Sequence, residues 1–141
     1  MKSISLFAAL TLIVFTGCES GPKLPATVPA EGKVTLDGEA VTDATVIFIA
    51  NVGSYNATSN TDKNGFFKMK AFEEKSGAVP GSYKVEVSKT IVESTGNKGG
   101  EGGANVKYGL PKKYSSMITS GLTISLSDKG DKDIKFELKS K

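Results

Sequence analysis

Apolar and polar residues alternate strictly in several short segments of this chain. The clearest alternation runs from Tyr83 to Ser88, where every second residue is apolar and the others are polar. The same pattern returns over 122–127 and 134–139. Successive side chains of a strand point to opposite faces, so a period of two predicts strands with one buried face. The sequence contains no comparable segment with the 3.6-residue period of a helix, and we therefore expect an all-β chain.

Turn signals separate the predicted strands. They lie at Asp37-Gly38, over 61–65 and over 79–81. The segment 44–50 is nearly all apolar, which indicates a central strand or one covered on both faces, and a weaker strand is expected over 54–60. Short strands with one apolar face and regular turns predict an antiparallel β-sandwich of about seven strands.

The apolar positions of these strands define the expected core. They are Val34, Leu36, Ala44, Val46, Phe48, Phe67, Met69, Tyr83, Val85, Val87, Leu122, Ile124, Leu126, Ile134, Phe136 and Leu138. Burial of each large side chain contributes roughly 1.5–3 kcal/mol before chain entropy is subtracted. Such a core needs no disulfide, and the chain has only one cysteine.

The N-terminus has the pattern of an export signal. Lys2 is followed by an apolar stretch over 4–15 and then by Thr16-Gly17-Cys18. The stretch is shorter than the roughly 20 residues that a membrane-spanning helix needs. Residues 15–18 resemble the lipobox of bacterial lipoproteins, with Phe15 where that family usually has Leu. The resemblance implies cleavage after residue 17 and a diacylglyceryl group on the Cys18 sulfur.

This interpretation divides the chain into a lipoprotein signal peptide over 1–17, a lipidated, proline-rich tether over 18–30 and a sandwich domain over 31–141. Two alternatives remain for the cysteine: an ordinary signal peptide that carries it by chance, or a buried free thiol. With lipidation, we expect an exported protein of the cell envelope that is held to a membrane through Cys18.

The composition argues against several functions. The 18 basic residues are all lysines, and the chain has no histidine. Histidine-based triads, Cys-His pairs and the usual zinc sites are therefore excluded. A net charge of +3 on 141 residues gives no case for nucleic-acid binding. We expect no enzyme activity, no cofactor and no metal, and we interpret the aspartates of 128–133 as a solvated turn.

Four motifs in order resemble the carboxypeptidase regulatory-like, or transthyretin-like, domains. They are Gly32–Gly38 with Ala44–Phe48, Thr61–Phe67, Pro80–Val85, and Leu110–Tyr114 with Ser120–Ile124. The last pair is similar to the end of small envelope lipoproteins built on this domain. The resemblance covers roughly residues 31–139. It implies a seven-stranded prealbumin-like sandwich and a non-catalytic role, with an envelope protein or a glycan as partner.

The segment 93–109 contains six glycines and is expected to be a loop. Four residues at its C-terminal end are candidates for ligand binding: Tyr108, Lys112, Lys113 and Tyr114. An aromatic ring beside lysines can stack on a sugar, although Tyr114 can equally pack into the core. The leading hypothesis is a lipid-anchored, non-catalytic module for binding or structural interaction. The alternative is an accessory module that binds a carbohydrate or small ligand through the 93–109 loop.

Overall fold

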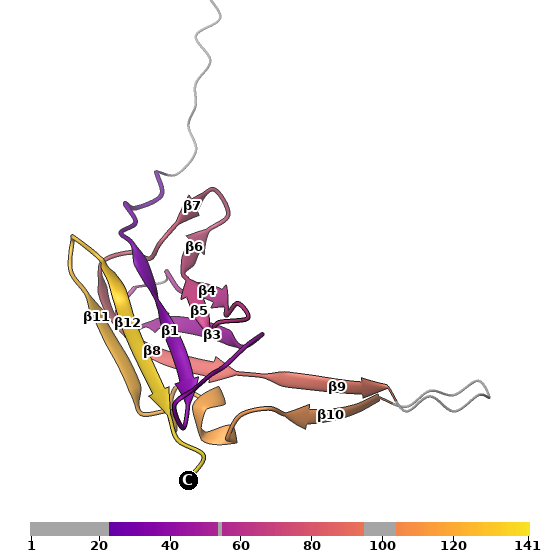
Figure 1. Cartoon of the computed structure of the whole chain (residues 1–141). Coiled ribbons are helices and arrows are strands. Elements are labelled where there is room, and N and C mark those ends of the chain that lie inside the picture. Colours follow the sequence, from indigo (N-terminus) through magenta and orange to yellow (C-terminus); the bar gives the residue numbers. More distant parts are fainter. Residues whose placement is uncertain (1–22, 54, 95–103) are drawn as a thin grey trace, which may run out of the picture.

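Two β-sheets face each other in the computed structural model, which describes residues 23–53, 55–94 and 104–141 (Figure 1). The first sheet contains β1 (Ala30–Leu36), β2 (Glu39–Ala40), β5 (Phe66–Lys68) and β12 (Asp131–Leu138). The second sheet has the order β11 (Leu122–Leu126), β8 (Gly81–Ser88), β3 (Thr45–Ala50), β4 (Ala57–Asn60), β6 (Lys70–Phe72) and β7 (Lys75–Ser76). The expected all-β sandwich is therefore confirmed.

The details of the strands differ from expectation in two ways. The described residues contain twelve strands rather than about seven, because short strands such as β2 and β7 lie beside the long ones. The pairing is also not purely antiparallel, since β1 and β12 are parallel from Ala30↔Asp131 to Leu36↔Leu138. No hairpin links these first and last long strands, so local turn geometry leaves their relative direction open.

The core lies between the two sheets and follows the alternation of the sequence. Every residue of the expected inward set is buried except Leu36, Leu122 and Ile124, which are partly buried and pack against the others. Phe48 of β3 is at the centre. Its ring centroid lies 6.2 Å from that of Phe67, 5.7 Å from that of Tyr83 and 6.1 Å from that of Phe136. These rings come from both sheets and join them.

The packed structure begins before residue 31. Val28 is 9% exposed and forms an isolated bridge with Ala78, with N–H···O distances of 2.8 and 3.0 Å. Ala30 is fully buried in β1. The last residues of the expected tether therefore belong to the sandwich, because small apolar side chains among the prolines fill the edge of the core.

One turn and one close contact show why glycine is required. In the Asp37-Gly38 turn between β1 and β2 both residues have positive φ, 50° and 92°, as expected for a tight hairpin. Gly32 has a different role. A Cβ built on it would lie 2.1 Å from the carbonyl oxygen of Ile134, so β1 and β12 approach too closely for a side chain.

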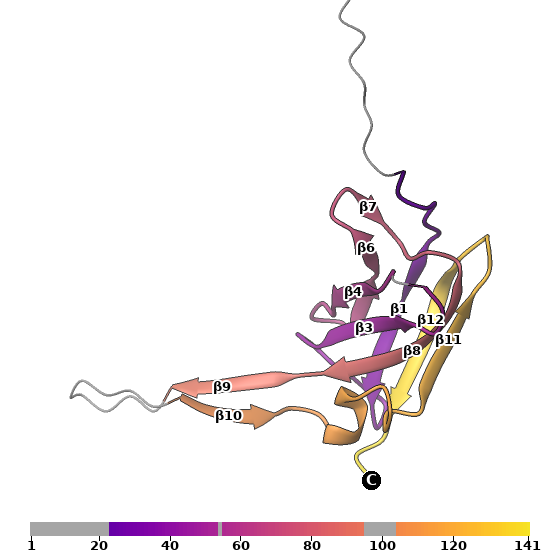
Figure 2. The same cartoon turned by 180° about the vertical axis from the view of Figure 1, so that it is seen from behind.

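A third pair of strands projects from the sandwich. β9 (Thr90–Ser94) follows β8 almost directly and, among the strands that the structure describes, pairs only with β10 (Ala104–Tyr108). We call this pair the arm; Figures 1 and 2 both show it extending sideways, away from the two sheets. After β10 the chain returns to the sandwich through the 3₁₀ helix η1 (Lys112–Ser115) and then enters β11.

Candidate functional site

The sandwich has two poles, which the direction of β1 defines. The N-terminal pole is where Val28 bridges Ala78 and β1 begins. The far pole is where β1 ends and the Asp37-Gly38 turn follows. β8 also ends near the far pole, because Lys89, the residue after it, lies beside Leu36 and donates from its Nζ to the Thr42 Oγ1 at 3.1 Å. The chain then continues into the arm. The expected ligand-binding residues gather at this far pole, around η1 and the base of the arm.

Tyr108 is the exposed aromatic residue of this group. It ends β10 with 56% of its surface accessible, and the Lys112 Nζ lies 4.6 Å from its ring centroid. A cation–π contact of this kind contributes about 0.5–1 kcal/mol at an exposed position. The ring and the ammonium group together present an apolar surface beside a positive charge. This is the arrangement that the sequence predicted for stacking on a ligand.

Tyr114 has the structural role that the sequence left as its alternative. It is 6% exposed, and its hydroxyl accepts a hydrogen bond from the Lys139 backbone N–H at 2.8 Å. The Lys113 Nζ lies 4.9 Å from the Tyr114 ring centroid and covers it from solvent. The four candidate residues therefore form two pairs with different surroundings. Tyr108 and Lys112 face outward together, whereas Tyr114 packs inward beneath Lys113.

Gly109 and Pro111 set the direction of the chain between these residues. The Gly109 N–H donates to the Lys89 carbonyl at 2.8 Å, and a Cβ on Gly109 would lie 2.9 Å from the Lys89 Cγ. Leu110 is buried, and the Pro111 carbonyl accepts the Tyr114 N–H at 3.1 Å. Pro111 precedes η1 with a φ of −55°, and within η1 Lys112 and Lys113 are exposed whereas Tyr114 is buried.

Asp37 gives the far pole a fixed negative charge. Hydrogen bonds from Ser140, including its backbone N–H at 3.3 Å, and the charges of Lys139 and Lys113 hold the pKa of Asp37 below its ordinary value of 3.8. The carboxylate is thus ionised at neutral pH and lies among lysines of η1 and the C-terminus. The far pole therefore carries both an ionised carboxylate and lysine side chains.

The sequence predicted a loop over 93–109, and this prediction is wrong at both ends of the segment, which are strands. Glu93 lies in β9, and Ala104–Tyr108 forms β10. These two strands pair with each other, and a Lys107–Glu93 ion pair of 2.7 Å links them. Sequence reasoning missed them because the many glycines of the segment dominate its composition. Residues 95–103 lie outside the described part of the chain.

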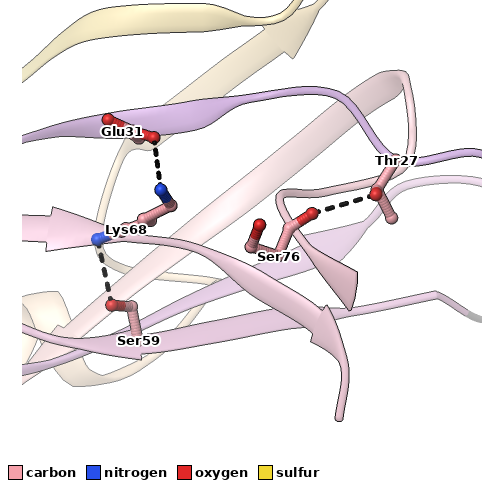
Figure 3. A network of polar contacts seen from close by, with 5 residues as sticks. All are labelled: Thr27, Glu31, Ser59, Lys68 and Ser76. Atoms are coloured by element: carbon pink, nitrogen blue, oxygen red, sulfur yellow. Dashed lines mark hydrogen bonds and ion pairs between the residues drawn. The ribbon is translucent and has the colours of Figure 1, made fainter. Parts of the chain in front are cut away.

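The structure also contains a groove that sequence reasoning missed. It has a volume of about 520 Å³ and lies along β5, between the two sheets. The Lys68 Nζ pairs with the Glu31 carboxylate at 3.1 Å, and the Lys68 N–H donates to the Ser59 Oγ at 3.2 Å (Figure 3). The Thr27 hydroxyl donates to the Ser76 carbonyl nearby, at 2.9 Å. These partners are distant in sequence, so no local pattern predicts the groove.

Asp62, Glu31 and Lys68 of this groove already have partners in the fold. Asp62 accepts the N–H groups of Asn64 and Phe66 at 2.8 and 2.9 Å and closes its turn. Glu31 and Lys68 neutralise each other. Phe66, 53% exposed, lies with its ring centroid 5.4 Å from the Lys33 Nζ. The groove is therefore a weaker candidate for ligand binding than Tyr108 and Lys112.

The sequence predicted a solvated turn over 128–133, but Asp131 and Asp133 are exposed residues at the start of β12, and their carboxylates already have partners. The Asp131 Oδ1 accepts the Asp133 N–H at 2.8 Å, and the Asp133 Oδ2 pairs with the Lys135 Nζ at 2.9 Å. Within residues 23–53, 55–94 and 104–141, no three Cys, Asp or Glu side chains gather in a way that could hold a metal ion. In the same residues, no helix is long and apolar enough to cross a bilayer.

The expected lipidation residue, Cys18, and the signal segment lie outside the described part of the chain. Comparison with protein-family models, with curated proteins and with solved structures found no match to this chain.

Proposed function

We propose that the protein is an exported, lipid-anchored protein of the cell envelope whose sandwich binds a partner through its far pole. The observation that carries the proposal is the position of the single cysteine, directly after an N-terminal apolar stretch and two small residues. Diacylglyceryl and amide-linked chains on Cys18 would supply the two or more acyl groups that stable anchoring needs. Lipidation explains both the presence of this thiol and its location.

The direction of β1 supports the choice of pole. The chain joins the sandwich at Val28, and β1 then runs toward Leu36 at the far pole. Seven residues of strand span about 23 Å at about 3.3 Å per residue. The segment from Cys18 to Thr27 spans up to about 30 Å at 3.1 Å per residue. An anchor at Cys18 would thus hold the N-terminal pole toward the membrane and turn Tyr108 and Lys112 away from it.

The proposal is non-catalytic binding rather than turnover. Without histidine or arginine the chain lacks the common general base near pH 7 and the bidentate anion clamp. Membership of the carboxypeptidase regulatory-like group is part of the proposal. The positions of the family-like motifs support this membership. Asp37-Gly38 and Asp62–Gly65 lie in turns, and Gly81 begins β8.

The anchor is tested by replacing its cysteine. We expect Cys18→Ser to move the full chain from the membrane fraction to the soluble fraction and to abolish incorporation of labelled fatty acid. The neighbouring Ser20→Ala variant is the matched control and should remain in the membrane and labelled. Membrane association of Cys18→Ser, together with an unlabelled wild-type chain, would refute the anchor.

A second candidate function follows from the exposure of Tyr108. Its accessible ring beside Lys112 suits stacking on a neutral sugar. A glycan array probed with the full chain tests this candidate. We expect Tyr108→Ala to remove any signal, whereas Tyr55→Ala, a tyrosine 42% exposed elsewhere on the sandwich, should retain it. Equal loss in both variants would contradict a site at Tyr108.

A further inference from the structure

We propose that two copies of this protein associate through one face of the arm. The uncharged face of the arm consists of Thr90 and Val92 from β9 and Val106 and Tyr108 from β10. The occupant of this face is the same face of a second copy. The proposal deepens the proposed function, because it names the partner, and it rests on that function for the common orientation of the two copies.

The register of the arm places these side chains together. Val92 is paired with Val106, and Thr90 with Tyr108. Directly opposite residues of an antiparallel pair share a face, so these four side chains lie on one side of the arm. Val92 is 63% exposed, Val106 58% and Tyr108 56%. The arm thus presents a continuous apolar strip to solvent on this side.

The other side of the arm carries the charges. Glu93 and Lys107 alternate with the two valines and form an ion pair of 2.7 Å. Ile91 also lies on this side, 40% exposed, and its Cδ1 lies within 3.3 Å of the Cβ position of Gly109 at the base of the arm. The arm therefore has one charged face, suited to water, and one uncharged face, suited to burial.

An arm of this kind that contacts nothing else has little stability of its own in water. A two-stranded hairpin that packs against nothing is marginally stable in water. In the described part of the chain, β9 and β10 pair only with each other, so neither sheet covers the valines. Removal of apolar surface from water contributes about 25 cal/mol per Å². Contact with a second apolar surface would therefore stabilise both the arm and the complex.

The charge pattern favours a second copy as that surface. In a two-fold contact the same patch meets itself, so a charged patch would oppose like charges. The two valines at the middle of the face avoid this repulsion, and the charged Lys112 lies beside Tyr108 at the base of the arm. Glu93 and Lys107 remain in solvent on the outer side. Valine would meet valine near the middle of the two arms, with Tyr108 toward the base of each.

The orientation of the arm also favours a second copy. In Figures 1 and 2 the arm extends across the direction of β1 rather than along it. Copies anchored through Cys18 to one membrane would therefore carry their arms at the same height. The face is small compared with the roughly 800 Å² per partner of standard stable interfaces. We therefore expect weak association that becomes substantial at the high effective concentration of a shared membrane.

Cysteine cross-linking in membranes tests the proposal with the full chain. Cys18 is the only natural thiol, and lipidation consumes it, so an introduced cysteine is the only reactive one. We expect Val106→Cys and Val92→Cys to form disulfide-linked dimers on treatment with copper phenanthroline. The control is Asn105→Cys, adjacent in β10 but on the charged face. The dimer yield of Val106→Cys should exceed that of Asn105→Cys at least fivefold.

Two further measurements distinguish a failure of the dimer proposal from a failure of the anchor proposal. Adding Val92→Lys to Val106→Cys should reduce the dimer yield to the Asn105→Cys level, with a thermal unfolding midpoint that reports an intact sandwich. Equal yields at positions 105 and 106, or a yield unaffected by Val92→Lys, would overturn the dimer and leave a foreign partner or a glycan as the ligand. Cross-linking of the wild-type chain would instead reveal a free Cys18 thiol and refute the anchor. If the protein is soluble, the same comparison on the purified full chain with Cys18→Ser, at millimolar concentration, decides whether the arm dimerises.

Discussion

The Tyr114 hydroxyl accepts a hydrogen bond of 2.8 Å from the backbone N–H of Lys139. It also lies 3.3 Å from the Lys139 carbonyl oxygen, to which it donates. One side chain of η1 thus forms hydrogen bonds with both the N–H and the carbonyl of Lys139, the residue just beyond the end of β12. This contact closes the far pole and fixes the strip of chain that carries Lys112 and leads back from the arm.

Removal of this hydroxyl should destabilise the sandwich. We expect Tyr114→Phe to lower the free energy of unfolding by about 1 kcal/mol, the usual contribution of a partly buried hydrogen bond. Tyr114→Ala should cost about 3–5 kcal/mol, because it also leaves a cavity. Urea denaturation measures both. The matched control is Tyr108→Phe, which should change stability by less than about 0.5 kcal/mol because its ring is exposed; equal effects at the two tyrosines would contradict the structure.

The stability of the sandwich should decrease when the Thr61 hydroxyl is removed. Its Oγ1 accepts the Ala44 N–H at 2.9 Å, and the residue is 3% exposed. The nearly isosteric Thr61→Val leaves that buried N–H without an acceptor, at a cost of about 1–3 kcal/mol. Thr61→Ser keeps the acceptor and should recover most of the loss. Thr58→Val, at an exposed position of β4, is the control, and a similar loss there would rule out the hydrogen bond as the cause.

Gly32 should tolerate no side chain. Because an added Cβ would lie 2.1 Å from the Ile134 carbonyl oxygen, Gly32→Ala must force β1 and β12 apart. We expect loss of cooperative thermal unfolding or a decrease in the midpoint of more than 10 °C. Gly53→Ala serves as the comparison, since a Cβ there has no neighbour within 4 Å and only its φ of 93° opposes the change. A native-like Gly32→Ala variant would disprove the close approach.

The lowered pKa of Asp37 predicts a loss of stability in acid. A carboxyl whose pKa is lower in the folded state favours folding when it is ionised. Its contribution is fully present above the ordinary value of 3.8 and is lost as the pH falls through the lower folded value. An NMR titration of the Asp37 carboxyl should have its midpoint below 3.8. Ser140→Ala should raise that midpoint, Ser127→Ala should leave it unchanged, and a wild-type midpoint at or above 3.8 would contradict the contact.

The alternation of the sequence predicted much of the fold. Tyr83, Val85 and Val87 are buried, whereas Lys84 is exposed and Glu86 and Ser88 are partly exposed. The prediction succeeds because each side chain's face depends only on its parity along the strand. The prediction of the site was less complete. Tyr108 and Tyr114 have similar neighbours in sequence, and only the turn through Gly109 and η1 directs one outward and the other into the core.

The composition of the segment 93–109 did not indicate the two strands of the arm. Val106 belongs to a short alternating run and Val92 follows Ile91 directly, yet the glycines between the two segments suggested an irregular loop. Pairing requires both strands at once, and neither run alone is long enough to indicate a strand. The apolar face of the arm therefore became visible only in the structure.

The sequence by itself determined the class of fold, most residues of the core and the presence of a single thiol, because the period of apolar residues and the chemistry of a side chain are local properties. The tertiary structure decided which strands are neighbours and which surfaces remain uncovered. Asp37 and Ser140, which meet at the far pole, are 103 residues apart. The parallel pairing of β1 with β12 likewise joins the two ends of the domain. Such contacts form only when the apolar faces of distant strands are buried together, so no local pattern can encode them.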